Sequence, residues 1–420
     1  MGFRRRQLVA AALTANAVRP VPGPRTGIPS FFAGWLTGEL APHLLAAIAT
    51  DTTLQVRPGR RPDPIGLALA AGTAAGLAHL IAQSRRSAHV AEEALADALG
   101  SDYLDALDAR PTPKDLATPW RSLVHPFRSR PDERIVVERD IAYNANGKRG
   151  FLDIYRPAGD VSGAPVLLQV HGGAWTIGTK EQQGLPLMRH LAAKGWICVA
   201  INYRLAPKHA FPAHIVDVKQ AIAWIREHIA AYGGDPSYLA ITGGSAGGHL
   251  CSLAALTAGD PAWQPGFEDA DTSVQCAVPH YGVYDVAGLT DLPGVTTMRD
   301  GFLGPKVLQT SYDDDPAAFE AASPLARITE QAPDFFVIHG SVDTLIDVRQ
   351  ARTFVDRLKE TSSKSVVYAE LPGAQHAFDT FPSIRSAHIV RAIDRYLHWH
   401  WNTWRAGLDH RDELSETSQA

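Results

Sequence analysis

Short apolar runs alternate with amphipathic stretches along the chain from residue 135 onward. Two of these runs, Ile135–Val137 and Leu152–Tyr155, are separated by Asn144, Asn146 and Gly147, which are typical turn residues, and so predict an antiparallel pair of strands. Six later runs are rich in apolar residues, as expected for parallel strands buried on both faces. These runs are Val166–Val170, Trp196–Ile201, Tyr238–Thr242, Val274–Val278, Phe335–Ile338 and Val366–Leu371.

Most stretches between these runs have helical periodicity. The residues Ile215, Val218, Ile222, Ile225 and Ile229 recur at intervals of three and four, which places them on one apolar face of a helix. Strands that alternate with such helices predict an α/β fold, in which a mostly parallel, eight-stranded sheet carries helices on both faces. Ligands of such sheets bind at the carboxyl ends of the strands, and each candidate functional residue below follows a strand.

The chain divides into regions of different composition. Residues 1–115 are rich in Ala, Arg and Pro and poor in strand-like runs, so we predict a helical N-terminal segment there. A linker at 116–130 leads to the main domain at 131–405, and a polar tail follows at 406–420. Glycines and prolines interrupt the strand pattern at about 285–333, which predicts a cap inserted over the site.

Three stretches of the N-terminal segment have helical character. Phe31–Thr50 is mostly apolar but contains Glu39 and Pro42, whereas Ile65–Ala82 contains no charged residue at all. Ala88–Leu107 then repeats apolar residues at helical spacing, with acidic residues between them. Of the three, Ile65–Ala82 is just long enough to cross the hydrocarbon layer of a bilayer.

Two interpretations of this segment stay open. Gly72 and Gly76 have the small-residue spacing that lets membrane helices approach closely, so residues 31–82 are a candidate for membrane association. Alanine and glycine drive insertion only weakly and His79 opposes it, so a soluble helical cap over the main domain is the alternative. The protein is therefore expected to be cytoplasmic or membrane-associated, and its oligomeric state is open.

Composition and charge narrow the class of protein. With 420 residues, of which 45% are hydrophobic and 20% charged, the chain can bury a large core. A net charge of −4 without long basic runs argues against a nucleic-acid partner. The three cysteines, Cys198, Cys251 and Cys276, lie in apolar stretches without a C-x-x-C pair, so we predict buried free thiols and no metal site.

Ser245 is the candidate nucleophile. It is the central residue of Gly243–Gly247, a G-x-S-x-G sequence that follows the run Tyr238–Thr242 and precedes a stretch of helix-forming residues. A sharp strand-to-helix turn requires glycine two positions before and after the serine, because neighbouring backbone approaches too closely for a Cβ atom. The turn leaves the serine hydroxyl exposed at the edge of the sheet.

A glycine-containing loop, His171–Trp175, follows the strand that ends at Val170. Its two glycines, Gly172 and Gly173, leave backbone N–H groups bare. Together with the N–H of Ala246, which follows the candidate nucleophile, these groups can bind the oxyanion that develops when a carbonyl is attacked.

Residues near these motifs have other predicted roles. His171 is expected to fix its loop rather than to carry a proton, and His280 and His339 are expected to be structural. Trp175 is a candidate for the wall of a substrate pocket, with packing beneath the loop as the alternative. Tyr281 is the second candidate for this pocket.

The candidate acid and base lie near the C-terminus. Asp343 and His376 each follow a predicted strand, so their loops face the same edge of the sheet as Ser245. A serine hydroxyl needs a base to take its proton, and an imidazole does so when a carboxylate fixes its tautomer. Asp347 and Asp379 are rivals for the role of the acid, but Asp347 is better placed to cap the following helix.

These motifs together make the chain similar to a known superfamily. Residues from about 130 to 405 resemble the α/β-hydrolase esterases and lipases, and more closely the branch similar to hormone-sensitive lipase, with its HGGG-type loop. The N-terminal extension is similar to that of actinobacterial carboxylesterases. The matching residues are His171-Gly172-Gly173, Asn202-Tyr203-Arg204-Leu205-Ala206-Pro207, Gly243-Gly244-Ser245-Ala246-Gly247-Gly248, Asp343 and Gly373-Ala374-Gln375-His376-Ala377-Phe378.

The sequence departs from the family pattern at three positions. Ala174 replaces the last glycine of the loop, Gly244 replaces the usual acidic residue before the serine, and Asn202 replaces an aspartate. Ala174 puts in doubt any inference about esters of bulky tertiary alcohols. None of the three changes removes a catalytic atom.

The resemblance implies a serine carboxylesterase of the α/β-hydrolase fold. Ser245 would be the nucleophile, His376 the base and Asp343 the acid that orients it, with the N–H groups of Gly172, Gly173 and Ala246 as the oxyanion hole. The substrate would be a small-molecule or lipid ester with a short to medium acyl chain, and no cofactor would be required. An amidase or peptidase on the same scaffold, or a non-catalytic protein that binds a membrane or partner, are the alternatives.

Overall fold

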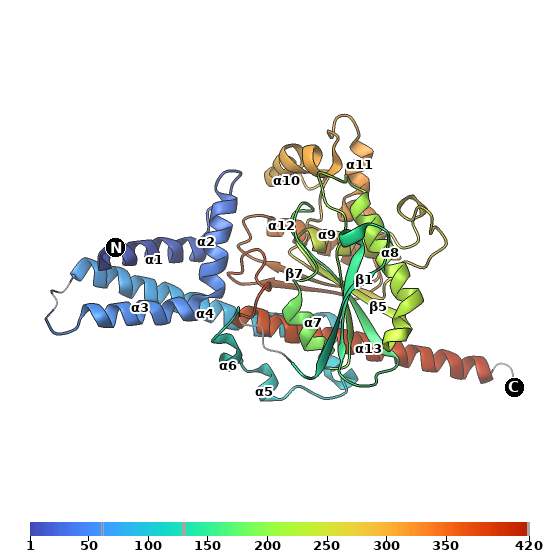
Figure 1. Ribbon diagram of the computed structural model, residues 1–420, viewed down its shortest axis with the longest axis horizontal. Coiled ribbons are helices and arrows are strands. Elements are labelled where there is room, and N and C mark those ends of the chain that lie inside the picture. The colour runs from blue at the N-terminus through green and yellow to red at the C-terminus, as the bar shows by residue number, and fades with distance from the viewer. Residues whose placement is uncertain (60, 62, 128–131, 418–420) are drawn as a thin grey trace.

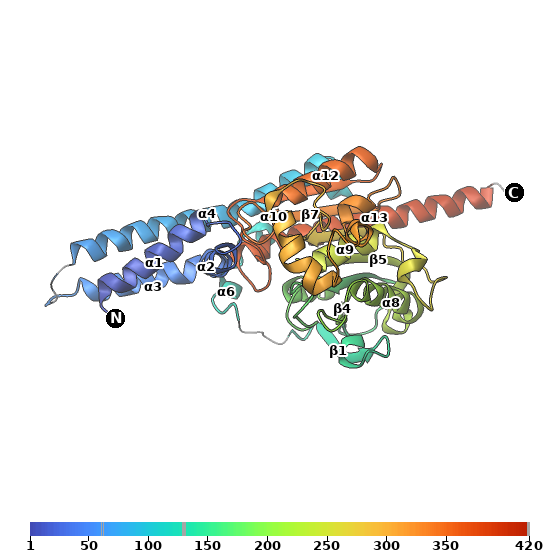
Figure 2. The same ribbon diagram turned by 90° about the horizontal axis from the view of Figure 1, so that it is seen from above.

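The computed structural model describes residues 1–59, 61, 63–127 and 132–417. A helical arm projects from an α/β body that holds the sheet (Figure 1). The view from above shows α1 (Phe3–Val18), α3 (Ala41–Gln55) and the first half of α4 (Pro64–Leu99) side by side in the arm, with α2 (Gly27–Glu39) at its base (Figure 2). The last helix, α13, runs along the body and extends beyond it at the opposite end (Figures 1 and 2).

The sheet has eight strands in the order β1-β2-β4-β3-β5-β6-β7-β8. Strand β2 is antiparallel to both of its neighbours, β1 and β4, and the remaining pairs are parallel. Each predicted run overlaps one strand, which confirms the predicted mostly parallel, eight-stranded sheet. The strands are β1 Ile135–Ala142, β2 Phe151–Pro157, β3 Ala164–Val170, β4 Ile197–Ile201, β5 Gly234–Gly244, β6 Cys276–His280, β7 Asp334–Gly340 and β8 Val366–Leu371.

Helices cover both faces of the sheet, because successive side chains of a strand point to opposite faces. In β3, Leu167 packs with the core beneath α4, α7 and α13, whereas Leu168 packs with the core beneath α8, α9 and α12. Both side chains are fully buried. These helices are α4 Pro64–Leu99, α7 Leu185–Ala192, α8 Ala213–His228, α9 Ala246–Leu256, α12 Val348–Thr361 and α13 Ile384–Thr417.

The predicted cap, residues 285–333, forms an irregular helical insertion between β6 and β7. It contains α10 Pro293–Met298, the π-helical segment Arg299–Leu308, α11 Pro316–Ala321 and a 3-10 turn at Pro324–Arg327. Its role as a cap stays a prediction. The remaining short helices are α5 Pro113–Leu116 and α6 Trp120–Leu123, with 3-10 turns at Tyr103–Ala106, Gly147–Gly150, Ile229–Tyr232 and Pro261–Trp263.

The N-terminal segment is helical, as predicted, but its helices begin and end elsewhere. The stretch Phe31–Thr50 is two helices whose axes bend by 78° at Leu40. Conversely, the stretch Ile65–Ala82 and the first part of Ala88–Leu107 join into the single helix α4, Pro64–Leu99, which is 36 residues long. The other three helices are α1 Phe3–Val18, α2 Gly27–Glu39 and α3 Ala41–Gln55.

The second half of α4 belongs to the body rather than to the arm. Ala91 and Leu95 are fully buried in the core that α13 covers, and Glu92 binds Arg395 of α13 at 2.7 Å. The predicted segment 1–115 is therefore not one packing unit, because α4 crosses from the arm into the core. At the other end of the chain, α13 continues through Thr417, so most of the predicted polar tail at 406–420 is helix.

Candidate active site

Ser245 lies at a strained turn between β5 and α9. Its backbone has φ 59° and ψ −121°, a conformation that costs energy for any residue with a Cβ atom. A Cβ on Gly243 would lie 2.5 Å from the carbonyl oxygen of Gly247, and one on Gly247 would collide with the carbonyl oxygen of Val170. Only glycine fits at these two positions, so the predicted strand–turn–helix context of the serine is confirmed.

The imidazole of His376 is held by Asp343. His376 Nδ1 lies 2.7 Å from Asp343 Oδ2, and both side chains are buried. The other carboxylate oxygen, Oδ1, accepts hydrogen bonds from the N–H groups of Leu345 and Ile346 at 2.8 and 2.9 Å. Burial alone would raise the pKa of this carboxyl, but His376 and His339 outweigh burial and hold the pKa well below its usual range.

The two rival carboxylates have other partners. Asp347 is the N-cap of α12 and accepts a hydrogen bond from the N–H of Arg349 at 3.0 Å, as predicted. Asp379 lies 2.5 Å from His280 Nδ1 through Oδ2 and accepts a hydrogen bond from the hydroxyl of Tyr281 through Oδ1. Neither is in a position to compete with Asp343 for His376 in this structure.

Tyr281 contacts both the elbow and the base. A Cβ on Gly244 would lie 2.6 Å from the tyrosine hydroxyl oxygen, which explains why glycine replaces an acidic residue there. The tyrosine ring lies 4.6 Å from the imidazole of His376, centroid to centroid. Gly244, which precedes Ser245, and His376 therefore border the same ring.

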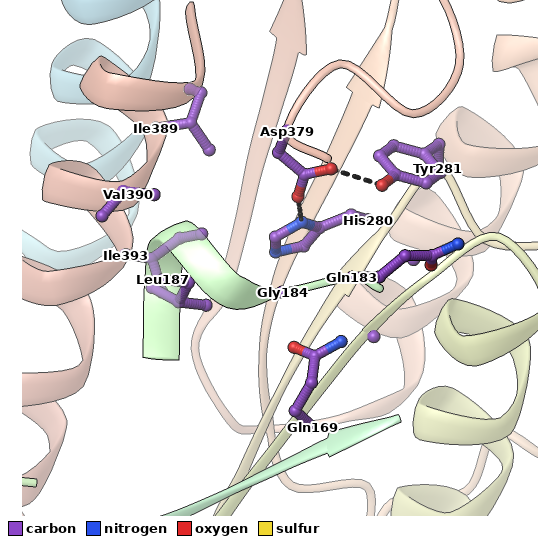
Figure 3. Close-up of a pocket in the computed structure, with 12 residues that line it drawn as sticks. Gln169, Gln183, Gly184, Leu187, His280, Tyr281, Asp379, Ile389, Val390 and Ile393 are labelled. Carbon is purple, nitrogen blue, oxygen red and sulfur yellow. Dashed lines mark hydrogen bonds and ion pairs between the residues drawn. The ribbon is translucent and has the colours of Figure 1, made fainter. Parts of the chain in front are cut away.

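A small cavity lies behind this tyrosine. Figure 3 shows the side chains of His280 and Tyr281 converging on Asp379 in its wall, with Gln169 and Gln183 on another side. Because Tyr281 is buried and its hydroxyl is bonded to Asp379, it lines this cavity rather than an open pocket. Its predicted contact with substrate has no support from this position.

The glycine loop differs from the prediction at one donor. The N–H of Gly172 donates to Oε1 of Gln183 at 2.7 Å, so it is occupied. Gly173 and Ala174 have positive φ angles of 116° and 51°, and their N–H groups have no acceptor among the residues that the structure describes. Ala246 is the first residue of α9, a position whose N–H has no partner within the helix. The free donors are thus Gly173, Ala174 and Ala246.

The other residues of the loop support its shape. His171 is buried, stacks on Tyr203 with the ring centroids 4.3 Å apart, and binds the carbonyl oxygen of Gly172 at 2.7 Å. Burial lowers the pKa of His171 to about 4, so it is neutral near pH 7, in line with a loop-fixing role. Trp175 packs beneath the loop, where its Nε1 donates to His249 Nδ1 at 3.3 Å. Trp175 therefore has the alternative position given above, beneath the loop, rather than a place in the wall of a substrate pocket.

The remaining expected features concern cysteines and metals. Cys198, Cys251 and Cys276 are buried free thiols, as predicted, and burial raises the pKa of Cys251. Within the described part of the chain, no group of three or more His, Cys, Asp or Glu side chains is placed to hold a metal ion.

Two residues near the site escaped the sequence analysis. Gln183 was missed because its partner, the N–H of Gly172, is a backbone group of another segment. Phe31 of α2 lies edge-on to His376, with ring centroids 5.8 Å apart, although 345 residues separate them along the chain. No local pattern in the sequence signals either contact.

Comparisons with known proteins identify the family of the chain. The family model BD-FAE matches residues 152–358. The probable carboxylic ester hydrolase LipM of Mycobacterium tuberculosis is 44% identical over 419 residues, which cover 96% of this chain and 94% of the relative. Esterase LipQ of the same organism is 43% identical over 369 residues, covering 87% of this chain and 84% of the relative.

Solved structures share the fold at lower identity. Esterase B from Lactobacillus rhamnosis has a TM-score of 0.54 and 20% identity, covering 67% of this chain and 92% of its own. A truncated carbohydrate esterase from gut microbiota has a TM-score of 0.52 and 22% identity, covering 63% of this chain and 96% of its own. From the sheet, the elbow and these relatives together, the chain belongs to the α/β-hydrolase superfamily and is one of its carboxylic ester hydrolases.

Proposed function

We propose that Ser245, His376 and Asp343 are the catalytic triad of this ester hydrolase. The observation that carries the proposal is the 2.7 Å bond between His376 Nδ1 and Asp343 Oδ2; the strained elbow that presents Ser245 supports it. The carboxylate accepts a hydrogen bond from Nδ1–H, which fixes the tautomer and leaves Nε2 of the imidazole free to accept the proton of the serine hydroxyl.

Hydrolysis then proceeds in two halves. Ser245 Oγ attacks the ester carbonyl carbon while His376 takes its proton, and the protonated imidazole returns that proton to the oxygen of the departing alcohol. Water attacks the acyl-enzyme with His376 again as the base, which releases the carboxylic acid and restores the serine. Every proton is held by the imidazole or by a reacting oxygen.

The oxyanion hole of this proposal consists of the N–H groups of Gly173, Ala174 and Ala246. These three N–H groups have no acceptor among the described residues, whereas that of Gly172 is bonded to Gln183. Gln183 then serves to hold the loop in the shape that exposes the next two N–H groups. Loss of one such donor costs about 3 kcal/mol of transition-state stabilisation in other serine hydrolases.

The test is Ser245→Ala assayed on a short p-nitrophenyl ester. Turnover is expected to fall by about 10⁴-fold or more, because the oxyanion hole alone gives only weak catalysis. The melting temperature serves as the control for folding. Turnover of the variant within tenfold of the wild type would reject the triad. Rates on a matched ester and amide distinguish the esterase from an amidase or peptidase on the same scaffold.

We further propose that the arm inserts into a lipid bilayer, which makes lipid esters accessible as substrates. The supporting observation is that large apolar side chains are exposed on the outside of the arm. Its packed interior combines small and polar residues with an apolar cluster that includes Leu77 and Leu80. The buried residues include Gln7, Thr14, Ser30 and Thr73, and the exposed ones include Leu8, Val9, Leu13, Val18, Leu54 and Ile65.

Exposed apolar side chains around small packed residues are a feature of membrane helices, which pack through small residues. A Cβ on Gly76 of α4 would lie 2.6 Å from the Thr14 methyl group of α1, so the two helices approach closely there. Helix α4 is long and apolar enough to cross a membrane, with a mean hydropathy of 1.8 over its best window. Charged residues gather at the tip, where Arg4 pairs with Asp63 and Arg6 with Asp51.

Flotation of the full-length protein with phospholipid vesicles tests this proposal. The wild type is expected to float with the vesicles, and Leu13→Asp on the exposed face of α1 is expected to reduce the floating fraction. Leu116→Asp, an exposed leucine outside the arm, is the matched control and should float as the wild type does. Wild-type protein that stays in the soluble fraction would reject membrane insertion.

A further inference from the structure

Helix α2 lies across the two loops that carry the proposed acid and base. Thr344, next to Asp343, donates from Oγ1 to the carbonyl oxygen of Gly27 at 3.0 Å. A Cβ on Gly27 would lie 2.8 Å from the carbonyl oxygen of Thr344, and one on Gly34 would lie 3.6 Å from Nε2 of Gln375, next to His376. Glycines on one face of α2 thus let it approach both loops.

A buried ion pair fixes the end of this helix. Glu39, the last residue of α2, binds Arg385 and accepts a hydrogen bond from the hydroxyl of Ser383 at 2.6 Å. Glu39, Arg385 and Ser383 are all buried. Because breaking a buried pair leaves an uncompensated charge, α2 is held firmly on the body.

Phe31 lies between the two glycines on the same face of α2. It is only 7% exposed, and its ring meets the imidazole of His376 edge-on, at 83° and 5.8 Å between centroids. The N-terminal segment therefore contributes a side chain that directly borders the proposed base.

Further aromatic rings continue from Phe31 to the surface. Phe32 and Trp35 lie 4.8 and 5.5 Å from it, and Trp35 in turn lies 5.6 Å from Phe381 of the body. Phe127 lies 5.0 Å from Phe381. Phe32 and Phe127 are 53% and 69% exposed, so the series ends in solvent. We call these five rings the aromatic wall.

We propose that the aromatic wall binds the alcohol part of the ester and so sets a preference for esters of long apolar alcohols. This inference rests on the proposed triad. His376 must deliver its proton to the oxygen of the departing alcohol, so the groups that border the imidazole face that side of the substrate. An apolar chain attached to this oxygen is removed from water when it lies along the five rings.

The two halves of the reaction provide the test. Acetate esters of methanol and of decanol form the same acetyl-enzyme, so only the first half depends on the alcohol. For Phe31→Ala, we expect the ratio of kcat/KM for decyl acetate to that for methyl acetate to fall about tenfold. The rate of hydrolysis of the acetyl-enzyme is expected to change by less than threefold. Phe31→Leu, which keeps an apolar side chain, should recover most of the ratio.

Controls separate this role from others. Phe32→Ala, at an exposed position of the aromatic wall, should lower the same ratio even if Phe31→Ala fails to fold. Val136→Ala, an exposed apolar residue of the edge strand β1, should leave it unchanged. Equal losses for both esters and for acetyl-enzyme hydrolysis would mean that Phe31 only positions His376, and would overturn the proposal.

Two further outcomes are decisive. A loss of kcat/KM in Phe31→Ala that grows with the length of the acyl chain, at constant alcohol, would also overturn the proposal. Such a loss would place the acyl group on the aromatic wall. Wild-type enzyme without ester turnover and without labelling of Ser245 would instead refute the triad. Turnover with an unchanged alcohol profile in Phe31→Ala and Phe32→Ala would refute the aromatic wall alone.

Discussion

Ser245 is held in a conformation that few non-glycine residues adopt. Its φ of 59° and ψ of −121° cost about 1–3 kcal/mol, which the packed neighbours must offset. The N–H of Ser245 donates to the carbonyl oxygen of His280 at 3.0 Å, and its own carbonyl oxygen accepts from His249 N–H at 2.9 Å. These two bonds fix the turn on both sides, so the position of the hydroxyl is set before substrate binds.

Asp343→Asn tests the orienting role of the carboxylate at the level of one atom. An amide in this position can present N–H to His376 Nδ1, which favours the wrong imidazole tautomer. We expect kcat on a short p-nitrophenyl ester to fall by about 10⁴-fold. Asp347→Asn is the matched control, because asparagine also caps a helix well, and should keep kcat within threefold. Similar activity in the two variants would contradict the assignment.

His214 gives a prediction about stability and pH. It is fully buried, and neither ring nitrogen has a hydrogen-bond partner among the described residues. Burial, with smaller contributions from nearby charged groups, lowers the pKa of His214 to about 3. The unfolded chain binds a proton at this histidine below about pH 6.5, whereas the folded chain does not, so its contribution to stability is lost as the pH falls from 6.5 toward 3.

His214→Met removes this titration while keeping an apolar side chain of similar size. The free energy of unfolding of the variant relative to the wild type is expected to rise by about 2 kcal/mol between pH 7 and pH 5. Urea unfolding at the two pH values measures the difference. A difference that does not depend on pH would contradict the prediction.

Individual residues were predictable from the sequence where a motif fixes their geometry. Asp343 and His376 follow strands, and the structure joins them by a hydrogen bond. The identity of the free N–H donors was not predictable, because it depends on the side chain of Gln183 reaching Gly172 from another segment. The position of Trp175 beneath its loop was likewise not predictable, because it depends on His249, which accepts a hydrogen bond from the indole there.

At the scale of elements, the junction of β3, β5 and α9 is the most tightly constrained part of the site. Gly247→Ala would drive a Cβ atom into the carbonyl oxygen of Val170, just before the loop that carries the proposed oxyanion donors. We expect at least a hundredfold loss of kcat/KM, because misplacing a donor by about 1 Å has effects of this size. Gly294→Ala in α10, where a Cβ meets no atom within 4 Å, should lose less than threefold.

Element boundaries were less predictable than element types. Arg85 and Arg86 lie between the predicted stretches Ile65–Ala82 and Ala88–Leu107. In the structure both arginines lie on the exposed face of one continuous helix, α4. The buried Ser84 donates back to the carbonyl oxygen of Leu80 at 2.9 Å, which satisfies its hydroxyl inside α4. Conversely, α2 ends at Glu39, whose side chain is bound by Arg385 and Ser383 of a distant segment.

For the whole molecule, the alternation of strands and helices was enough to predict the layered sheet. The relation of the N-terminal segment to the body could not be predicted, because it depends on contacts between residues hundreds of positions apart. The sequence left a membrane helix and a soluble cap as alternatives. In the structure the arm projects away from the body while Phe31 of α2 packs against the proposed base, so the proposed membrane insertion of the arm and a covering role of α2 are compatible (Figure 1).

Truncation separates the arm from the body. A chain without residues 1–62 loses α1, α2 and α3, and with α2 the carboxylate that pairs with Arg385, but keeps all of α4, so it should fold with reduced stability and still hydrolyse methyl acetate. A chain without residues 1–110 also loses Ala91, Leu95 and Tyr103 from the core, and should aggregate or unfold. Circular dichroism and thermal melting measure the difference. Equal stability of the two truncated chains would contradict the assignment of α4 to the core.

The most direct test of the account is to locate the covalent intermediate by mass spectrometry after reaction with an organophosphate. The prediction is a single stoichiometric label on the peptide that contains Ser245, with none on the Ser245→Ala variant and much slower labelling of His376→Ala. Stoichiometric labelling of a different residue, or labelling of Ser245→Ala at the wild-type rate, would contradict it.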